Sequence, residues 1–223
     1  MPNDHELPVT DRTRLRREPD RGRFDRVTID SIIDSTPICH LGFNDDEGRP
    51  VVIPTIHARI GETLYVHGSA ASRAMRTTGK GVEVCCTITN LDGLVVARSG
   101  FASSMNYRTV MVFGVSRLVT DPDELAAALD AIVDHVLPGR TDEIRANTPK
   151  EIAATKVVAL QIDEASAKVR TGGVHDEEVD LGTAVWAGVV PLRMVAGTPE
   201  PSDDVPAEIG VPMSVQRVVE RFV

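Results

Sequence analysis

Seven short segments rich in Val, Ile and Thr constrain the fold of this chain more than any other feature. β-Branched residues favour strands, and turn chemistry separates these segments at Asn44–Gly48, at Gly61-Glu62 and at Asp92-Gly93. Consecutive strands joined by short turns are antiparallel neighbours, and six or more of them predict a β-barrel. The seven segments are Ile38–Phe43, Val51–Ile60, Thr63–His67, Val82–Thr89, Leu94–Ala97, Arg108–Thr120 and Val157–Ile162.

Start and stop signals predict a few peripheral helices. Asp121-Pro122-Asp123-Glu124 combines an N-cap residue, a Pro at the first helical position and an early acid, and the helical spacing of apolar residues then continues to Pro138. Other helices are predicted between Thr28 and Pro37, from Thr148-Pro149-Lys150-Glu151 onward, and within Val211–Val223. The sequence therefore predicts a mainly β protein with helices at its periphery.

The two ends of the chain differ in composition from the middle. Residues 1–23 mix six Arg with five acids and almost no large apolar side chains, which predicts a mobile arm. Three Pro residues and four acids between 197 and 210 predict an extended linker. We therefore expect one barrel domain over 24–195, followed by a linker and a short helix over 196–223.

Charge limits the kinds of molecule that we expect this chain to bind, and cysteine content indicates its compartment. The 33 acidic and 24 basic residues give a formal charge of −9, which argues against general binding of nucleic acids or acidic membranes. No apolar run is long enough to cross a bilayer, and the first 23 residues contain no signal-peptide core. Cys39, Cys85 and Cys86 are predicted to be reduced core residues, so we expect a cytoplasmic protein.

The junction between a strand and a helix near residues 65–76 is the most informative segment. The strand is predicted to end at His67, Gly68 lets the backbone turn, and Ser69 is placed as the N-cap of the next helix. Basic and hydroxyl side chains follow at Ser72, Arg73, Arg76 and Lys80. Two interpretations stay open here: a phosphate site at the helix start, or a plain junction with solvated arginines. No glycine-rich motif of the dinucleotide or P-loop type is present, which argues against ATP or NAD binding by those folds.

Histidines on successive predicted strands raise the question of a metal. The three are His40, His57 and His67. If Gly61-Glu62 is a two-residue hairpin loop, Ile60 faces Thr63, and His57 and His67 then lie on opposite faces. No Cys or acid at ligand spacing accompanies them, so the sequence predicts no metal site.

A polar stretch precedes the longest apolar strand. Ser103–Arg108 places hydrogen-bonding groups where they could contact a flat heterocycle at a barrel rim. An ordinary polar loop that caps a strand is the competing interpretation, and no GxSxG motif points to a serine hydrolase.

Taken together, four stretches resemble the pyridoxamine 5′-phosphate oxidase-like flavin-binding split barrels, and among them the nitroimidazole-resistance proteins. The resemblance extends over residues 24–195. The four stretches are Ile38–Phe43, Pro54-Thr55 with Leu64–Ser69, Ser104–Gly114 and Val185–Leu192.

The resemblance implies a six-stranded antiparallel split barrel that forms a homodimer, with FMN, or in some branches a deazaflavin or haem, between the subunits. Thr109 stands where the family usually has an amide side chain. His67 would line the groove as a candidate proton donor, and Trp186 would close over the cofactor. The residues implied to contact the cofactor are Ile53, Pro54, Thr55, Ile56, His67, Gly68, Ser69, Ser72, Arg73, Asn106, Tyr107, Arg108, Thr109 and Trp186. Of these, Ser69, Ser72 and Arg73 would hold the phosphate.

Three functional hypotheses follow from the resemblance. The first is an FMN-dependent oxidoreductase that passes electrons or hydride from reduced flavin to a small planar acceptor. The second is a non-enzymatic haem- or flavin-binding protein, with His40, His57 or His67 as candidate axial ligands. The third is a deazaflavin-dependent reductase on the same fold. The physiological substrate and electron donor do not follow from the sequence.

Overall fold

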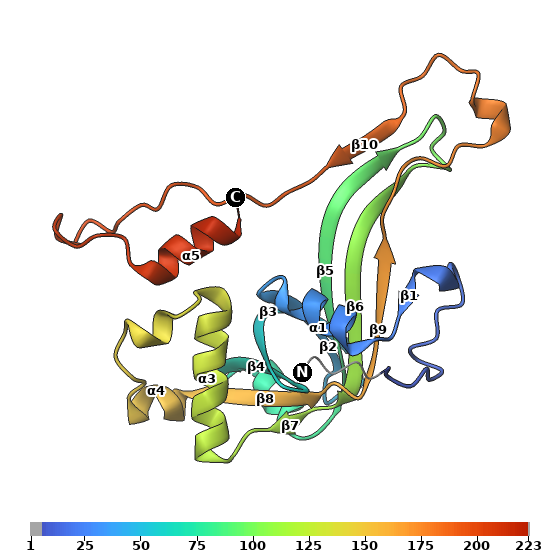
Figure 1. Cartoon of the computed structure of the whole chain (residues 1–223). Coiled ribbons are helices and arrows are strands. Elements are labelled where there is room, and N and C mark those ends of the chain that lie inside the picture. Colours follow the sequence, from blue (N-terminus) through green and yellow to red (C-terminus); the bar gives the residue numbers. More distant parts are fainter. Residues whose placement is uncertain (1–5, 223) are drawn as a thin grey trace. The chain divides into compact units, whose positions relative to one another are not determined.

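The computed structural model describes residues 6–222 and divides by its internal contacts into two compact units (Figure 1). Unit 1 consists of Met1–Thr36, Cys85–Phe113 and Asp163–Arg193. Unit 2 consists of Pro37–Val84, Gly114–Ile162 and Met194–Val223.

Unit 1 is built on long strands that run beside one another (Figure 1). They follow the order β1-β9-β6-β5, and β10 pairs with β5. The strands are β1 (Gly22–Arg23), β5 (Glu83–Val96), β6 (Ser104–Val115), β9 (Glu164–Arg170) and β10 (Gly188–Pro191). The helical elements are η1 (Pro19–Arg21), α1 (Arg26–Asp34) and η3 (Glu178–Asp180).

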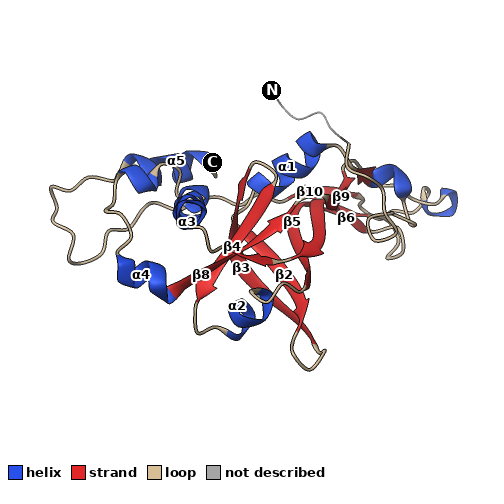
Figure 2. Ribbon diagram, turned by 90° about the horizontal axis from the view of Figure 1, so that it is seen from below, coloured by secondary structure: helices blue, strands red, loops and turns tan. Residues whose placement is uncertain are grey.

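Unit 2 contains the remaining strands in the order β2-β3-β4-β8-β7. These are β2 (Ile38–Asn44), β3 (Pro50–Ile60), β4 (Thr63–Ser69), β8 (Thr155–Gln161) and β7 (Arg117–Leu118). Its helical elements are α2 (Arg73–Thr78), α3 (Pro122–Val136), η2 (Arg140–Asp142), α4 (Pro149–Ala154) and α5 (Met213–Arg221). In Figure 2, α2 and α3 lie on opposite sides of β4 and β8.

The core of unit 2 lies between α3 and the sheet. Successive side chains of a strand point to opposite faces, so β4 can pack against a different helix on each side. The Tyr65 hydroxyl donates a 2.9 Å hydrogen bond to Glu124 at the start of α3. The buried cluster consists of Ala58, Tyr65, Val119, Ala128, Leu129, Ile132, Val157 and Ala159. Removal of this apolar surface from water holds α3 on β3, β4 and β8.

The predicted fold class is confirmed, since the chain is mainly antiparallel β with peripheral helices, consistent with a split barrel. The described residues contain ten strands rather than six. Two of the additional strands, β1 and β7, have only two residues each, and β9 consists largely of small and charged residues. Such strands are specified by pairing with neighbours rather than by their own β propensity.

The turn predicted at Asp92-Gly93 is wrong, because β5 continues through these residues. The Asp92 carboxylate accepts two hydrogen bonds, of 2.9 and 2.8 Å, from the Arg108 guanidinium on β6. Gly93 pairs with Pro191, and a Cβ added to Gly93 would lie 3.1 Å from the Val190 carbonyl oxygen. The glycine therefore allows β10 to approach β5 closely and does not reverse the chain.

Two of the predicted helix starts are confirmed. The Asp121 side chain accepts from the Glu124 N–H at 2.8 Å, and Thr148 and Glu151 form a capping box. The first helix is capped by Asp25, which accepts from the Thr28 N–H, so it begins earlier than predicted. Met213–Arg221 form the C-terminal helix.

The N-terminal segment has contacts within unit 1 from residue 6 onward. Thr10 and Arg12 both donate to the Glu164 carboxylate, and Thr13 is buried. Residues 1–5 of the predicted arm lie outside the described residues. Whether 1–23 move, and whether 24–195 act as one domain, stay predictions. Within residues 6–222, no helix has the length and apolar character needed to span a membrane.

Candidate functional site

A pocket of about 190 Å³ in unit 2 brings His67 together with residues of α3 and α4; we call it the His67 pocket. His67 reaches it from β4, where it pairs with Val157 of β8. Its other lining residues are Leu129, Ile132, Val133, Asn147, Glu151 and Thr155. The apolar side comes from α3 and the polar side from α4 and its flanks, so the pocket can hold a ligand that has an apolar part and a polar part.

The imidazole of His67 has a free nitrogen in this environment. Its Nδ1 is buried, and among residues 6–222 it has no hydrogen-bond partner. Burial lowers the pKa of His67 below its usual value of 6.5, so the ring is neutral at neutral pH. A neutral imidazole with an unused nitrogen can bind a metal ion or a hydrogen-bond donor on a ligand. It is less suited to the proton-donor role predicted from the resemblance.

The other two candidate histidines lie elsewhere. Ile60 pairs with Thr63 and His57 with Val66, which confirms the two-residue loop and separates His57 from His67 in the ladder. His57 is fully buried, and its ring centroid lies 5.1 Å from that of His135 on α3. His40 is exposed on β2, opposite Pro54. In the part of the chain that is described, no three His, Cys, Asp or Glu side chains gather as a metal site.

A second pocket in unit 2, of about 290 Å³, lies between α2 and the turn that joins β2 to β3; we call it the Arg73 pocket. Its lining residues are Asp45, Asp46, Glu47, Arg49, Arg73, Arg76, Thr77 and Lys80. Four of these eight side chains are cationic and three are acidic. An anion can therefore bind only beside cations that are not already paired with these acids.

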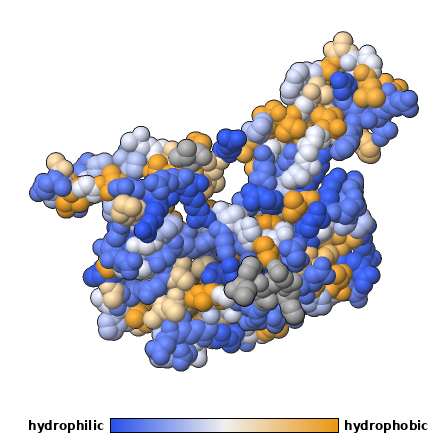
Figure 3. Space-filling model, viewed as in Figure 1, coloured by the Kyte–Doolittle hydropathy of each residue, from blue (hydrophilic) through white to orange (hydrophobic). Residues whose placement is uncertain are grey.

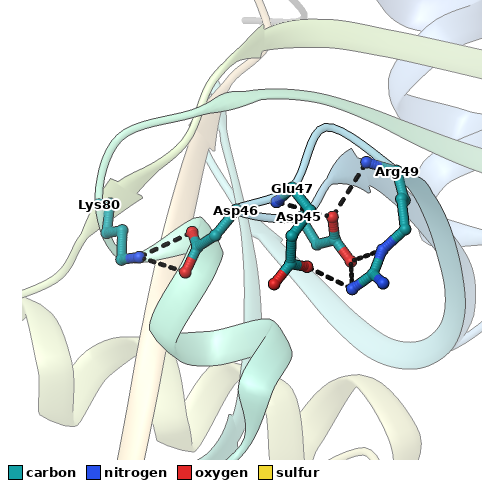
Figure 4. A network of polar contacts seen from close by, with 5 residues as sticks. All are labelled: Asp45, Asp46, Glu47, Arg49 and Lys80. Atoms are coloured by element: carbon teal, nitrogen blue, oxygen red, sulfur yellow. Dashed lines mark hydrogen bonds and ion pairs between the residues drawn. The ribbon is translucent and has the colours of Figure 1, made fainter.

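Every acid of the Arg73 pocket is ion-paired, and two cations serve the three acids (Figure 4). The Lys80 Nζ donates to both oxygens of Asp46, at 2.7 and 2.8 Å. The Arg49 guanidinium donates to Asp45 at 2.9 Å and also to Glu47. Within the described residues, Arg73 and Arg76 have no ion-pair partner. These two exposed guanidiniums are therefore available to a ligand.

The stability that the Asp45 carboxylate gives to the turn beside this pocket depends on pH. Hydrogen bonds from Arg49 lower the pKa of Asp45 to about 2, against about 3.9 for an unfolded aspartate. Because the folded pKa is the lower one, the carboxylate stabilises the fold above pH ~4, and this contribution is lost as the pH falls toward 2. We expect Asp45→Asn to be less stable than the wild type at pH 7. The difference in urea midpoint should disappear at the acid end of a pH series, and a constant difference would contradict the assignment.

The residues predicted to hold a phosphate are only partly brought together. Arg73 lines the Arg73 pocket, whereas Ser69 and Ser72 do not. The predicted N-cap at Ser69 is wrong: Ser69 is the last residue of β4, and Ser72 occupies the N-cap position without a side-chain cap bond. The Ser69 hydroxyl instead accepts from the Ala71 N–H at 3.3 Å, because β4 continues two residues past His67 to pair with β8.

Gly68 has a different role from the one its sequence context indicated. It lies within β4, opposite Lys156 of β8, rather than in a turn. A Cβ on Gly68 would lie 2.9 Å from Cγ of Met75, the buried side chain by which α2 packs on this face of β4. The glycine thus sets how closely α2, and with it Arg73, approaches the sheet.

The four residues predicted to lie under a flavin ring form the middle of β3. Ile53 and Thr55 are partly buried, whereas Pro54 and Ile56 are exposed on the alternate positions. The ladder places Ile56 opposite Ile38 and Pro54 opposite His40. This face of the β2–β3 hairpin is therefore an apolar strip that is open to a ligand or to another chain.

The remaining five predicted residues all belong to unit 1, on β6 and before β10. Arg108 is bound to Asp92, and the Thr109 hydroxyl donates to the Ile88 carbonyl at 2.8 Å. Tyr107 pairs with Arg170 of β9. Trp186 is 65% exposed, and its ring lies over Gly188. Its exposure leaves the indole able to cover a bound molecule.

Arg170 was missed by the sequence analysis. Its side chain is buried and donates to Asn106 Oδ1 at 2.5 Å and to the Gly173 carbonyl at 3.2 Å. The sequence shows only an arginine at the end of a charged segment, since the burial depends on pairing between β9 and β6. Asn147, Glu151 and Thr155 of the His67 pocket were missed because their place beside His67 depends on pairing between β8 and β4.

Comparison with known proteins identifies the family of this chain. The model of the family described as pyridoxamine 5′-phosphate oxidase matches residues 25–169, which is more than half of the chain. The chain belongs to this family. The pyridoxamine 5′-phosphate oxidase match includes the His67 pocket, the Arg73 pocket and β6, and ends before Arg170 and Trp186. None of the curated proteins compared with the chain matches it.

Several solved structures are similar to this member of the pyridoxamine 5′-phosphate oxidase family. The flavocytochrome Anf3 from Azotobacter vinelandii is 38% identical with a TM-score of 0.87, covering 93% of this chain and 96% of its own. The FAD and heme binding protein from Mycobacterium smegmatis is 39% identical with a TM-score of 0.84, covering 88% and 96%. A candidate 5-nitroimidazole antibiotic resistance protein from Bacteroides thetaiotaomicron is 26% identical with a TM-score of 0.56, covering 66% and 86%.

Proposed function

We propose that this chain is a redox protein that binds FAD and a haem, as a flavocytochrome does. The observation that carries the proposal is its identity of 38% and 39%, over about nine tenths of its length, to two proteins described as a flavocytochrome and as a FAD and heme binding protein. The proposal replaces FMN by FAD as the expected flavin and unites the flavin and haem alternatives drawn from the sequence.

The His67 pocket offers what a haem requires. Iron in haem proteins is commonly held by a neutral histidine nitrogen, and His67 has a buried nitrogen without a partner and a lowered pKa. Leu129, Ile132 and Val133 supply an apolar wall. The pocket, at about 190 Å³, is smaller than the 300–1,000 Å³ usual for such ligands, so a haem bound there extends beyond it.

The flavin requires a cation for its phosphates and a flat surface for its ring. Arg73 supplies an unpaired guanidinium, and the middle of β3 supplies an extended backbone with the exposed Pro54 and Ile56. When bound, a flavin exchanges one or two electrons and a haem iron exchanges one. The chain itself binds and orients these groups and keeps His67 unprotonated.

The absorption spectrum of the protein, purified and then reconstituted with FAD and haem, tests this function. We expect a Soret band together with the two bands of an oxidised flavin, each cofactor bound in proportion to protein. A protein that takes up neither cofactor would refute the proposal. Flavin or deazaflavin bands without a Soret band would favour the reductase hypotheses instead.

A second candidate function is reduction of a small planar acceptor at the flavin. It is favoured by the similarity to the candidate 5-nitroimidazole resistance protein. Oxidation of the reduced, reconstituted protein by a nitroimidazole, followed through the return of flavin absorbance, measures this activity.

We also propose that two copies associate, with the cofactors at their interface, in a reducing compartment such as the cytoplasm. Two exposed apolar pairs support association, Ile38 with Ile56 and Leu94 with Val190. Apolar side chains also gather over β10 (Figure 3). Three free cysteines suit a reducing environment.

Substitution of Ile38 tests the association. Light scattering should give a dimer mass for the wild type, and Ile38→Asp should weaken the dimer by about 2 kcal/mol or more, because a charge then replaces an apolar side chain of the interface. The matched control is Val27→Asp, an equally exposed position on α1. A wild type that is monomeric at micromolar concentration would contradict the proposal.

A further inference from the structure

We propose that the Arg73 pocket binds the second phosphate of a dinucleotide flavin and that Arg76 is the residue that recognises it. The inference rests on the proposed flavin binding and adds a determinant that distinguishes FAD from FMN. The juxtaposition behind it is a pocket of about 290 Å³ with two unpaired guanidiniums beside a turn whose three acids are all ion-paired with Arg49 or Lys80.

The charges of the pocket leave two separate positions for an anion. Of its four cations, Lys80 is held by Asp46, and Arg49 is held by Asp45 and Glu47 (Figure 4). Arg73 and Arg76 are exposed and, within residues 6–222, have no carboxylate partner. They are three residues apart on α2, so their Cβ atoms lie about 5–6 Å from each other on one side of the helix.

This arrangement matches a diphosphate better than a monophosphate. In FAD each of two linked phosphates carries one negative charge, whereas in FMN a single terminal phosphate carries up to two. A guanidinium forms paired, charge-assisted hydrogen bonds with one phosphate at a time. Because the family resemblance assigns the phosphate common to both flavins to Arg73, we assign to Arg76 the phosphate that only FAD has.

The Asp46–Lys80 pair controls the strength of this site. Both side chains are more than half exposed, at 62% and 55%, so the pair is held by its own attraction rather than by burial. Loss of the Asp46 charge removes a repulsion from the pocket and frees the Lys80 ammonium for the ligand. Asp46 therefore weakens binding of any anion in this pocket, which is an effect opposite in sign to that of Arg76.

Dissociation constants of FAD and FMN, measured with the full chain by quenching of flavin fluorescence at low ionic strength, test the inference. Arg76→Gln should weaken FAD binding about 10- to 100-fold, the worth of a charge-assisted hydrogen bond, and FMN binding by less than about 3-fold. Arg73→Gln should weaken both flavins by a similar factor. Lys150→Gln, the same change at an exposed cation of α4 outside the pocket, is the control and should alter neither.

Asp46→Asn provides a test that a folding defect cannot imitate. It should tighten FAD binding by about 2- to 5-fold, the range expected from an exposed ion pair. Equal factors for FAD and FMN in Arg76→Gln, or weaker FAD binding in Asp46→Asn, would overturn the assignment of Arg76 while leaving flavin binding intact. A wild type that binds neither flavin would instead refute the proposed function.

Discussion

Replacing His67 by Ala is expected to remove the Soret band of the reconstituted protein while its flavin bands remain. His67 has a buried nitrogen without a partner, is neutral at neutral pH and faces the apolar wall of α3. Haem affinity should fall by more than about tenfold, because residues that only orient metal ligands already contribute 10- to 100-fold. The flavin bands should persist, since the Arg73 pocket is lined by none of the same residues.

Two further measurements distinguish loss of the haem ligand from general damage to the fold. Added imidazole should restore the Soret band of His67→Ala, because it replaces the missing nitrogen in the space left behind. His40→Ala, at an exposed histidine of β2, is the matched control and should keep its haem. A Soret band of unchanged position and intensity in His67→Ala would show that another residue binds the iron.

The second large effect is expected on stability. Ile132 on α3 is 4% exposed, belongs to the buried cluster of unit 2 and lines the His67 pocket. Ile132→Ala removes apolar burial and leaves a cavity between α3 and the sheet, so we expect the free energy of unfolding to fall by about 2–5 kcal/mol. The measurement is a shift of the urea midpoint followed by circular dichroism.

Ile144→Ala makes the same chemical change at a position of unit 2 that is 44% exposed. Its stability should remain within about 0.5 kcal/mol of the wild type. Similar losses for the two variants would mean that α3 does not contribute to the buried core of unit 2. Because Ile132 also lines the His67 pocket, the same variant should lower the affinity for haem.

Local chemistry explains which parts of the fold were predictable. Asp121 and Thr148 cap their helices as expected because capping involves residues only three positions apart. Gly61, at a φ of 58°, forms the predicted two-residue loop for the same reason. The Asp92-Gly93 prediction failed because β10, almost a hundred residues later, pairs across Gly93 and keeps the strand extended.

The residues of the candidate site divide in the same way. Those marked by their neighbours in the sequence were predicted, and those placed by tertiary contacts were not. Arg73 and His67 were recognised because each lies in a segment whose residues resemble a known family, and each lines a pocket in the structure. Arg170 and Asn147 were not recognised, since nothing next to them in the sequence indicates their surroundings. Their surroundings depend on β9 pairing with β6 and on β8, which follows α4, pairing with β4.

By itself, the sequence determined a mainly β chain with capped helices, an acidic surface and a basic segment from Arg73 to Lys80 that contains no acid. These properties follow from residue types and short spacings. The tertiary structure decided which cations are free: it pairs Lys80 with Asp46, 34 residues away, and leaves Arg73 and Arg76 for a ligand. It also placed His67 in one pocket with residues of α3 and buried its Nδ1. Both outcomes depend on distances between segments far apart in the chain, which the order of residues alone does not specify.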